Sequence, residues 1–261
     1  MNDLVNYYRS SKETTYNAVL CVFGGLIWIG IFYLLVSAEK EHIFAMLPLA
    51  MYVILFVLFF VVLAFLFRAK AMGNMILLSK EQFPHIYQMV SEGAEKLRIP
   101  EPEAFIYNSN GLINAFARQL FGRRYLLLTS AIVDATTDEQ VRFIVGHELG
   151  HHAAGHLNFF GYFLRLPARI IPFLHKAYSR QCEYTSDKLG LAISRDVENS
   201  SKAIAMLGCG CHKLNGQLNL FAFEKQEHQV PAVSGYIAEI LSSHPRLTRR
   251  VISLKNTRIF D

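Results

Sequence analysis

Charged residues are scarce in this sequence. They make up 18% of its 261 residues, whereas hydrophobic residues make up 52%, and the mean hydropathy is +0.24. The chain also has no internal repeat and no low-complexity linker, and its four cysteines form no regular framework. These absences exclude a disordered chain, a collagen-like chain and a small disulfide-stabilised domain. The length leaves room for one domain and a further segment.

Basic residues are not clustered. No basic run is longer than two residues, as in Arg249-Arg250, and no aromatic residues alternate with basic ones, so we expect no nucleic-acid binding. Residues 71–261 contain 21 basic and 17 acidic residues, an ordinary balance for a globular domain. Their mildly positive charge suits a domain that lies against an anionic lipid surface.

The excess of apolar residues lies in two uncharged runs, 18–36 with 19 residues and 45–67 with 23. A helix of about 20 apolar residues crosses the hydrocarbon core of a bilayer. The sequence therefore predicts a transmembrane hairpin within a membrane anchor over residues 1–70, followed by a second domain over 71–261. Residues 37–44 are the expected loop, and Pro48 lies near the start of the second helix, where proline is tolerated.

Positive charges indicate the orientation of this hairpin. Arg9 and Lys12 precede the first run, Arg68 and Lys70 follow the second, and the loop contains only Lys40. The positive-inside rule then places both termini and the second domain in the cytoplasm, where cysteines stay reduced. The alternative is a cleaved signal peptide ending near residues 36–38. The length of the first run and the second run directly after it argue against cleavage.

The second domain is predicted to be of mixed α and β structure. Apolar spacing predicts a helix over 83–97, and short β-rich runs at 104–107, 112–117 and 125–129 predict a small antiparallel sheet. Thr137, with Gln140 three residues later, is typical of a helix start, and we expect that helix to continue to about His156. The fold class is therefore α+β, a two-helix anchor followed by a mainly helical domain.

The predicted helix carries His147-Glu148-Leu149-Gly150-His151. Histidines four positions apart lie on one side of a helix and can share a tetrahedral metal ion, and Glu148 can act as a base on a water molecule there. The alternative is an exposed helix that happens to be rich in histidine. His152 and His156, at about 140° and 180° around the helix from His147, are expected to be structural or surface residues.

A zinc site of this kind needs a third protein ligand. Glu183 and Asp187 lie four positions apart on a second predicted helix, so Glu183 can bind the metal while Asp187 orients a ligating histidine. The metzincin class is excluded because Ala154 and Leu157 occupy the positions of its glycine and third histidine.

In these motifs the chain resembles the HtpX-like and CAAX prenyl endopeptidase family of membrane-anchored zinc metallopeptidases, which are gluzincins. The resemblance implies a zincin-type domain with one Zn²⁺ per chain, held by His147, His151 and Glu183, and with Glu148 as the general base. The motifs that match are residues 114–117, 147–151, Glu183 with Asp187, and 243–245 with Arg250.

The same resemblance implies roles for further residues. Asn114, Ala115 and Phe116 would belong to an edge strand that pairs with the peptide substrate. His244 would stabilise the oxyanion, and Arg250 would have a structural or substrate-orienting role. The alternative for residues 243–245 is a simple turn before a helix.

The chain departs from the family in one segment. Only 31 residues separate His151 from Glu183, and the apolar stretch 159–174 is interrupted by two arginines and two prolines. We expect it to lie at the membrane interface with its arginines toward the lipid headgroups, and the active site to be open rather than enclosed. Cys209 and Cys211 are expected to be plain thiols, and Cys182 a core residue.

The expected function is that of a membrane-bound zinc endopeptidase acting on peptides or proteins at the bilayer, in membrane-protein quality control or in the cleavage of membrane-adjacent segments. One alternative is the processing of a dedicated lipidated or signalling peptide. Another is a non-catalytic scaffold that keeps zinc only to hold its fold. Glu148 argues against the scaffold, because a structural metal site needs no base.

Overall fold

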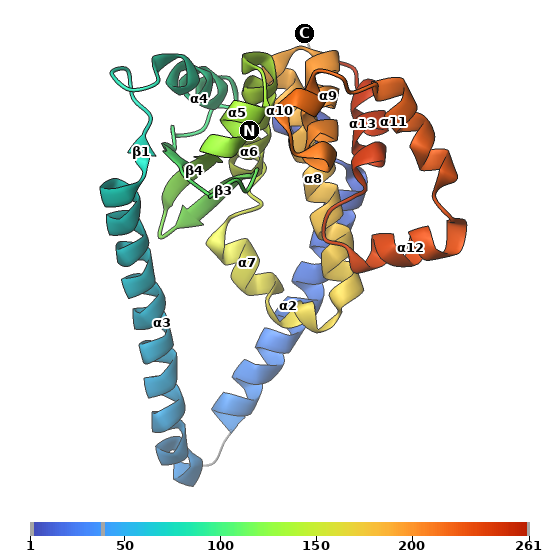
Figure 1. Ribbon diagram of the computed structural model, residues 1–261. Coiled ribbons are helices and arrows are strands. Elements are labelled where there is room, and N and C mark those ends of the chain that lie inside the picture. Colours follow the sequence, from blue (N-terminus) through green and yellow to red (C-terminus); the bar gives the residue numbers. More distant parts are fainter. Residues whose placement is uncertain (1–2, 38–39, 260–261) are drawn as a thin grey trace.

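The computed structural model describes residues 3–37 and 40–259. Two long helices, α2 (Ser11–Ser37) and α3 (Lys40–Asn74), diverge from a common end (Figure 1). At their far ends they join the rest of the described chain, which is mostly helical and is called the body below. Both are long and apolar enough to cross a membrane, over Ser11–Ser37 and Met51–Asn74. The loop expected at 37–44 is largely helical, since α3 already begins at Lys40, and its residues 38 and 39 lie outside the described residues.

The two long helices relate differently to the body. Most apolar side chains of α3 between Met51 and Leu66 are exposed, and its end joins the body, where Phe67 and Ala71 pack with Phe105, Tyr125 and Leu127. Helix α2 instead runs beside α8 (Pro172–Ser194) in Figure 1. The short helix α1 (Asp3–Tyr8) before α2 contributes Val5 and Tyr8 to the main core. The division into an anchor over 1–70 and a domain over 71–261 stays a prediction, but the start of the chain packs on the body.

The sheet has the strand order β1-β2-β4-β3 and is mixed. The prediction of an antiparallel sheet is wrong for its centre, because β2 and β4 pair in parallel. A hairpin at Phe121 and Gly122, both with positive φ, joins β3 to β4 and leaves β3 at the edge, so β4 returns in the direction of β2. The strands are β1 (Ile76–Leu77), β2 (Glu103–Tyr107), β3 (Ala115–Leu120) and β4 (Arg123–Thr129).

Helices cover this sheet and form the main core together with side chains of β2 and β4. The predicted helix start is confirmed: Thr137 and Gln140 form a reciprocal capping box at the start of α6 (Asp138–Ala153). The other elements are α4 (Pro84–Lys96), α5 (Ser130–Ala135), α7 (Phe159–Arg165), η1 (Pro167–Ile170), α9 (Val197–Cys209), α10 (His212–Asn215), α11 (Leu220–Gln226), η2 (Glu227–Gln229), α12 (Ala232–Leu241) and α13 (Leu247–Lys255).

Helices α6 and α8 cross in close contact at two glycines, Gly146 and Gly190. A Cβ atom on Gly190 would lie 3.0 Å from the backbone nitrogen of His147 and 3.0 Å from the carbonyl oxygen of Phe143. Only glycine allows the two backbones to approach this closely. The crossing places the side chains of α8 against the histidines of α6.

We expect Gly190→Ala to lower the free energy of unfolding by about 1–3 kcal/mol, because the added methyl group meets backbone atoms that cannot move aside. Gly73→Ala is the matched control: a Cβ there meets no atom within 4 Å, so no loss of stability is expected. Chemical denaturation of both variants in detergent measures the difference. Equal stability of the two variants would contradict the tight crossing.

The segment 159–174 lies beside the first membrane helix. The Trp28 indole donates a hydrogen bond to the carbonyl oxygen of Phe163 at 3.0 Å and stacks on its ring. Arg165 was expected to face the headgroups, and this is wrong: its side chain is buried, donates to Asn17 at 2.8 Å and lies over the Tyr178 ring. An arginine beside a polar acceptor and an aromatic face is stabilised without lipid.

Candidate active site

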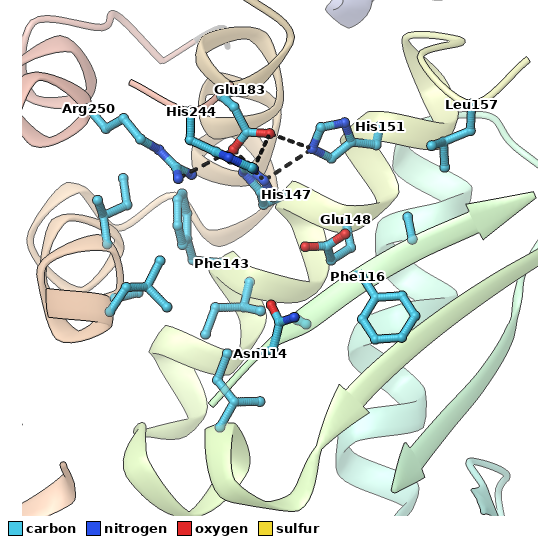
Figure 2. A pocket seen from close by; sticks show the side chains of 17 residues that line it. Asn114, Phe116, Phe143, His147, Glu148, His151, Leu157, Glu183, His244 and Arg250 are labelled. Carbon is cyan, nitrogen blue, oxygen red and sulfur yellow. Dashed lines mark hydrogen bonds and ion pairs between the residues drawn. The ribbon is translucent and has the colours of Figure 1, made fainter. Parts of the chain in front are cut away.

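Three side chains from two helices converge on one point. The Nε2 atoms of His147 and His151 lie 3.2 Å apart, and Glu183 approaches them with one carboxylate oxygen each, at 3.7 and 3.5 Å (Figure 2). One ligand atom from each of the three lies within 4.8 Å of the others. The structure thus brings together the three residues that the sequence suggested as metal ligands.

The outer nitrogen of His147 is held by a buried ion pair. Its Nδ1 donates to Asp187 at 2.9 Å, and Arg250 donates to both oxygens of the same carboxylate, at 2.8 and 2.6 Å. Burial by itself raises the pKa of Asp187, but Arg250 and His147 more than offset this effect and lower the pKa to about 2. Asp187 therefore contacts the outer nitrogen of His147, the kind of contact that the sequence suggested for it.

The outer nitrogen of His151 has a partner that sequence reasoning missed. Its Nδ1 lies 3.0 Å from Nδ1 of His156, a residue expected to face elsewhere. That expectation extended the helix too far: α6 ends at Ala153, and Gly155, with φ of 75°, turns the chain back toward the site. His152 is a structural residue, as expected, since it is buried and donates to the Tyr125 carbonyl oxygen.

The contact with Asp187 places a proton on Nδ1 of His147, because a carboxylate accepts. In the neutral ring Nε2 of His147 then has a lone pair that can bind a cation beside Nε2 of His151, which lies 3.2 Å away, and beside Glu183. Two imidazole nitrogens and one carboxylate are the donor set of catalytic zinc sites with an open fourth position. The residues present therefore fit a divalent metal ion.

Glu148 lies in the same cavity, of about 280 Å³, without joining the ligand cluster (Figure 2). Burial raises the pKa of its carboxyl group to about 6, and a backbone hydrogen bond from Ala117 of strand β3 moderates this effect. A carboxylate with a pKa near neutrality is suited to accept and return a proton.

The strand predicted to bind the peptide borders the cavity. Ala115 and Phe116 begin β3. The backbone carbonyl oxygen of Asn114, directly before this strand, accepts from the backbone N–H of Thr129, and the backbone N–H of Asn114 donates to the Thr129 hydroxyl. Within the described residues, β3 pairs only with β4, so its outer edge is available for a further strand. The strand begins later than predicted, because Ser109 and Leu112 form a turn before it.

His244 lies at the rim of the cavity, in the loop before α13. Its side chain is 64% exposed, and its Nε2 lies 3.7 Å from Glu183. The neighbouring Arg246 anchors this loop by donating to Glu227 at 3.1 Å. The loop is thus both a turn before a helix and a wall of the site. Arg250 is buried, and its side chain is committed to Asp187 and Glu183.

The cysteines do not belong to the cluster of His147, His151 and Glu183. The structure shows Cys209 and Cys211 as free thiols at the end of α9 and just after it. Cys182 is buried in a small core cluster with Leu20, Ala168 and Tyr178, as expected, and burial raises the pKa of its thiol.

Comparison with known proteins agrees with this geometry. The model of peptidase family M48 matches residues 80–168 and 158–258. Plastoglobule-localized metallopeptidase 48 of Arabidopsis thaliana is 25% identical over 59% of this chain and 48% of its own length. An HtpX protease homologue of Picrophilus torridus is 33% identical over 38% of this chain and 34% of its own length. Another, of Acidovorax ebreus, is 24% identical over 66% of this chain and 71% of its own length.

The chain thus spans about half of the first relative and about a third of the second. The matched family region contains every residue of the ligand cluster and the carboxylate beside it. With its two apolar helices, the chain is a membrane protein and belongs to the HtpX-like metallopeptidases of peptidase family M48.

Proposed function

We propose that the protein is a membrane-anchored zinc endopeptidase with one Zn²⁺ per chain. The observation that carries this proposal is the convergence of His147, His151 and Glu183 on one point, with Glu148 in the same cavity. A structural zinc site is closed by four protein ligands and needs no base. Three ligands with a nearby buried carboxylate favour a catalytic site over a scaffold.

The proposed reaction assigns each group a role. Bound zinc would supply a Lewis acid that polarises the scissile carbonyl group and lowers the pKa of water. Glu148 takes a proton from the attacking water on its carboxylate and delivers it to the leaving amine. The edge of β3 aligns the peptide by main-chain hydrogen bonds, and His244 donates to the developing oxyanion.

The biological role that we propose is membrane-protein quality control or the cleavage of membrane-adjacent segments, with the catalytic site facing the cytoplasm. The support is the anchor: α2 is long and apolar enough to cross a membrane, and its first turn packs behind the site, so the site would be held near the place where such substrates emerge. Two relatives named as HtpX proteases are consistent with a proteolytic role.

Metal analysis and proteolysis of the full chain in detergent test this function together. We expect one zinc per chain and cleavage of an unfolded protein such as casein, loss of both after chelation, and recovery when zinc is returned. Glu183→Gln should fail to recover either, because one of three ligands is weakened. Absence of bound metal from the wild type would refute the proposal, and zinc without cleavage of casein would favour a dedicated substrate or a scaffold.

A further inference from the structure

A buried carboxylate from the first membrane helix lies behind the metal centre. Glu13, in the first turn of α2, is 2% exposed, and its Oε1 lies 3.2 Å from Nε2 of His156. His156 in turn contacts the ligand histidine, with 3.0 Å between its Nδ1 and Nδ1 of His151. Glu13, His156 and His151 thus form a continuous hydrogen-bonded chain, although Glu13 is separated from His156 by 143 positions.

Counting protons gives these hydrogen bonds a single direction, from His151 through His156 to Glu13. When Nε2 of His151 faces a metal ion, the proton of this ring is on Nδ1, so His151 donates to Nδ1 of His156. The proton of His156 is then on Nε2, where it donates to Glu13. Each ring nitrogen is then either a donor or an acceptor, and the Glu13 carboxylate accepts the last hydrogen bond. Outer partners that orient metal-bound histidines form this pattern.

The remaining contacts of Glu13 complete this arrangement. Its Oε2 accepts a hydrogen bond from the buried hydroxyl of Thr185 on α8, and Nε of Arg9 lies 3.3 Å from Oε1. The carboxylate is therefore fixed from both sides. The same arrangement is found at the other histidine of the site, where Asp187 accepts from His147 and itself accepts from Arg250.

Cys182 lies close enough to Glu13 and His156 for the three to be considered as a second metal site. The proton count argues against this alternative. A metal ion on Nε2 of His156 would place the proton of His156 on Nδ1, where it would meet the Nδ1 proton of His151. The first metal site and a second one at Glu13 therefore exclude each other, whereas the hydrogen-bonded chain and the first site support each other.

We propose that Glu13 of the first membrane helix is a positioning residue of the metal centre, which fixes the orientation and the proton of the ligand His151 through His156. This inference rests on the proposed function, since it requires a metal ion at His151. Its consequence is that the affinity for the metal depends on how α2 is seated against the body.

The test is the affinity of the detergent-solubilised full chain for zinc, measured by competition with a chelator of known affinity. Removal of an outer partner of a metal ligand lowers metal affinity by about 10–100-fold. We expect this loss for Glu13→Ala and His156→Phe, and a smaller loss for Glu13→Gln, whose amide oxygen still accepts from His156. The double variant Glu13→Ala/His156→Phe should bind zinc no more weakly than His156→Phe alone, because both changes break the same chain.

Ser10→Ala is the structural control. Its hydroxyl donates to Gln181 at 3.0 Å and so ties the same turn of the chain to α8 without touching His156. We expect unchanged zinc affinity in this variant. The absorption spectrum of the cobalt-substituted protein should shift in Glu13→Ala and not in Ser10→Ala, because it reports the geometry of the ligands.

Three results would overturn the inference. If zinc affinity in Glu13→Ala equals that of wild type, Glu13 only docks the helix, and the proposed function stands. If the wild type binds two zinc ions and Glu13→Ala binds one, Glu13 is itself a metal ligand. If the wild type binds no metal, the proposed function fails together with the positioning role.

Discussion

Replacing Glu148 by glutamine is expected to lower the rate of peptide hydrolysis by about 10²–10⁴-fold while the metal stays bound. The amide has nearly the same shape as the carboxylate and can keep the backbone hydrogen bond near Ala117, but it cannot accept the proton of water. The side chain does not belong to the ligand cluster, so metal content should not change. Initial rates of casein cleavage, with zinc content measured on the same samples, give the result.

Glu139→Gln is the matched control for this change. Glu139 is exposed in the first turn of the same helix, α6, and does not line the cavity, so we expect wild-type activity. Full activity in Glu148→Gln with zinc bound would remove Glu148 from the mechanism. Loss of zinc in that variant would mean that Glu148 supports the metal site rather than the proton transfer.

Replacing Arg250 by methionine is expected to lower the free energy of unfolding by about 3–5 kcal/mol, because the buried Asp187 carboxylate keeps the hydrogen bond from His147 but loses the guanidinium that neutralises its charge. Arg250 and Asp187 are 6% and 2% exposed, so water cannot replace the lost partner. The same change should weaken metal binding, since Asp187 is the group that holds His147. Denaturant unfolding in detergent measures the first effect.

Two further variants separate the effect of breaking the buried ion pair from the effect of removing an arginine side chain. Arg249→Met removes a neighbouring, 46% exposed arginine that pairs with Glu227, and we expect a loss of less than about 1 kcal/mol. Arg250→Met/Asp187→Asn removes both charges of the buried pair and should recover most of the stability but not the metal affinity. Equal losses in Arg250→Met and Arg249→Met would show that the buried pair does not stabilise the fold.

The ligand cluster could be predicted because its spacing is local. His147 and His151 share one face of α6, and Glu183 and Asp187 share one face of α8, since four positions make about one helical turn. The start of α6 was equally predictable, because the capping box at Thr137 involves residues only three positions apart. Each of these spacings is set within one segment, whereas the meeting of Glu183 with the two histidines depends on the crossing of α6 and α8.

The partners behind the ligands could not be predicted in this way. His156 contacts His151 only because α6 ends at Ala153 and Gly155 turns the chain. Gly155 could have indicated this helix end, but the helix predicted from the sequence continues to about His156. Arg250 reaches Asp187 across 63 positions. The role that we propose for Glu13 had only one sign in the sequence, an acidic residue just before an apolar run.

The sequence by itself determined the two long apolar helices and the helix that places His147 and His151 on one face, because apolar runs and helical spacing act over one or a few turns. Only the tertiary structure decided that β2 and β4 pair in parallel, that the Arg165 side chain is buried, and that the first turn of α2 lies behind His151 and His156. These contacts join segments far apart in the chain. The pairing of β2 with β4 depends on the course of the chain between them, and the contacts of Arg165 and Glu13 depend on how α2 packs against the other helices, which no local pattern encodes.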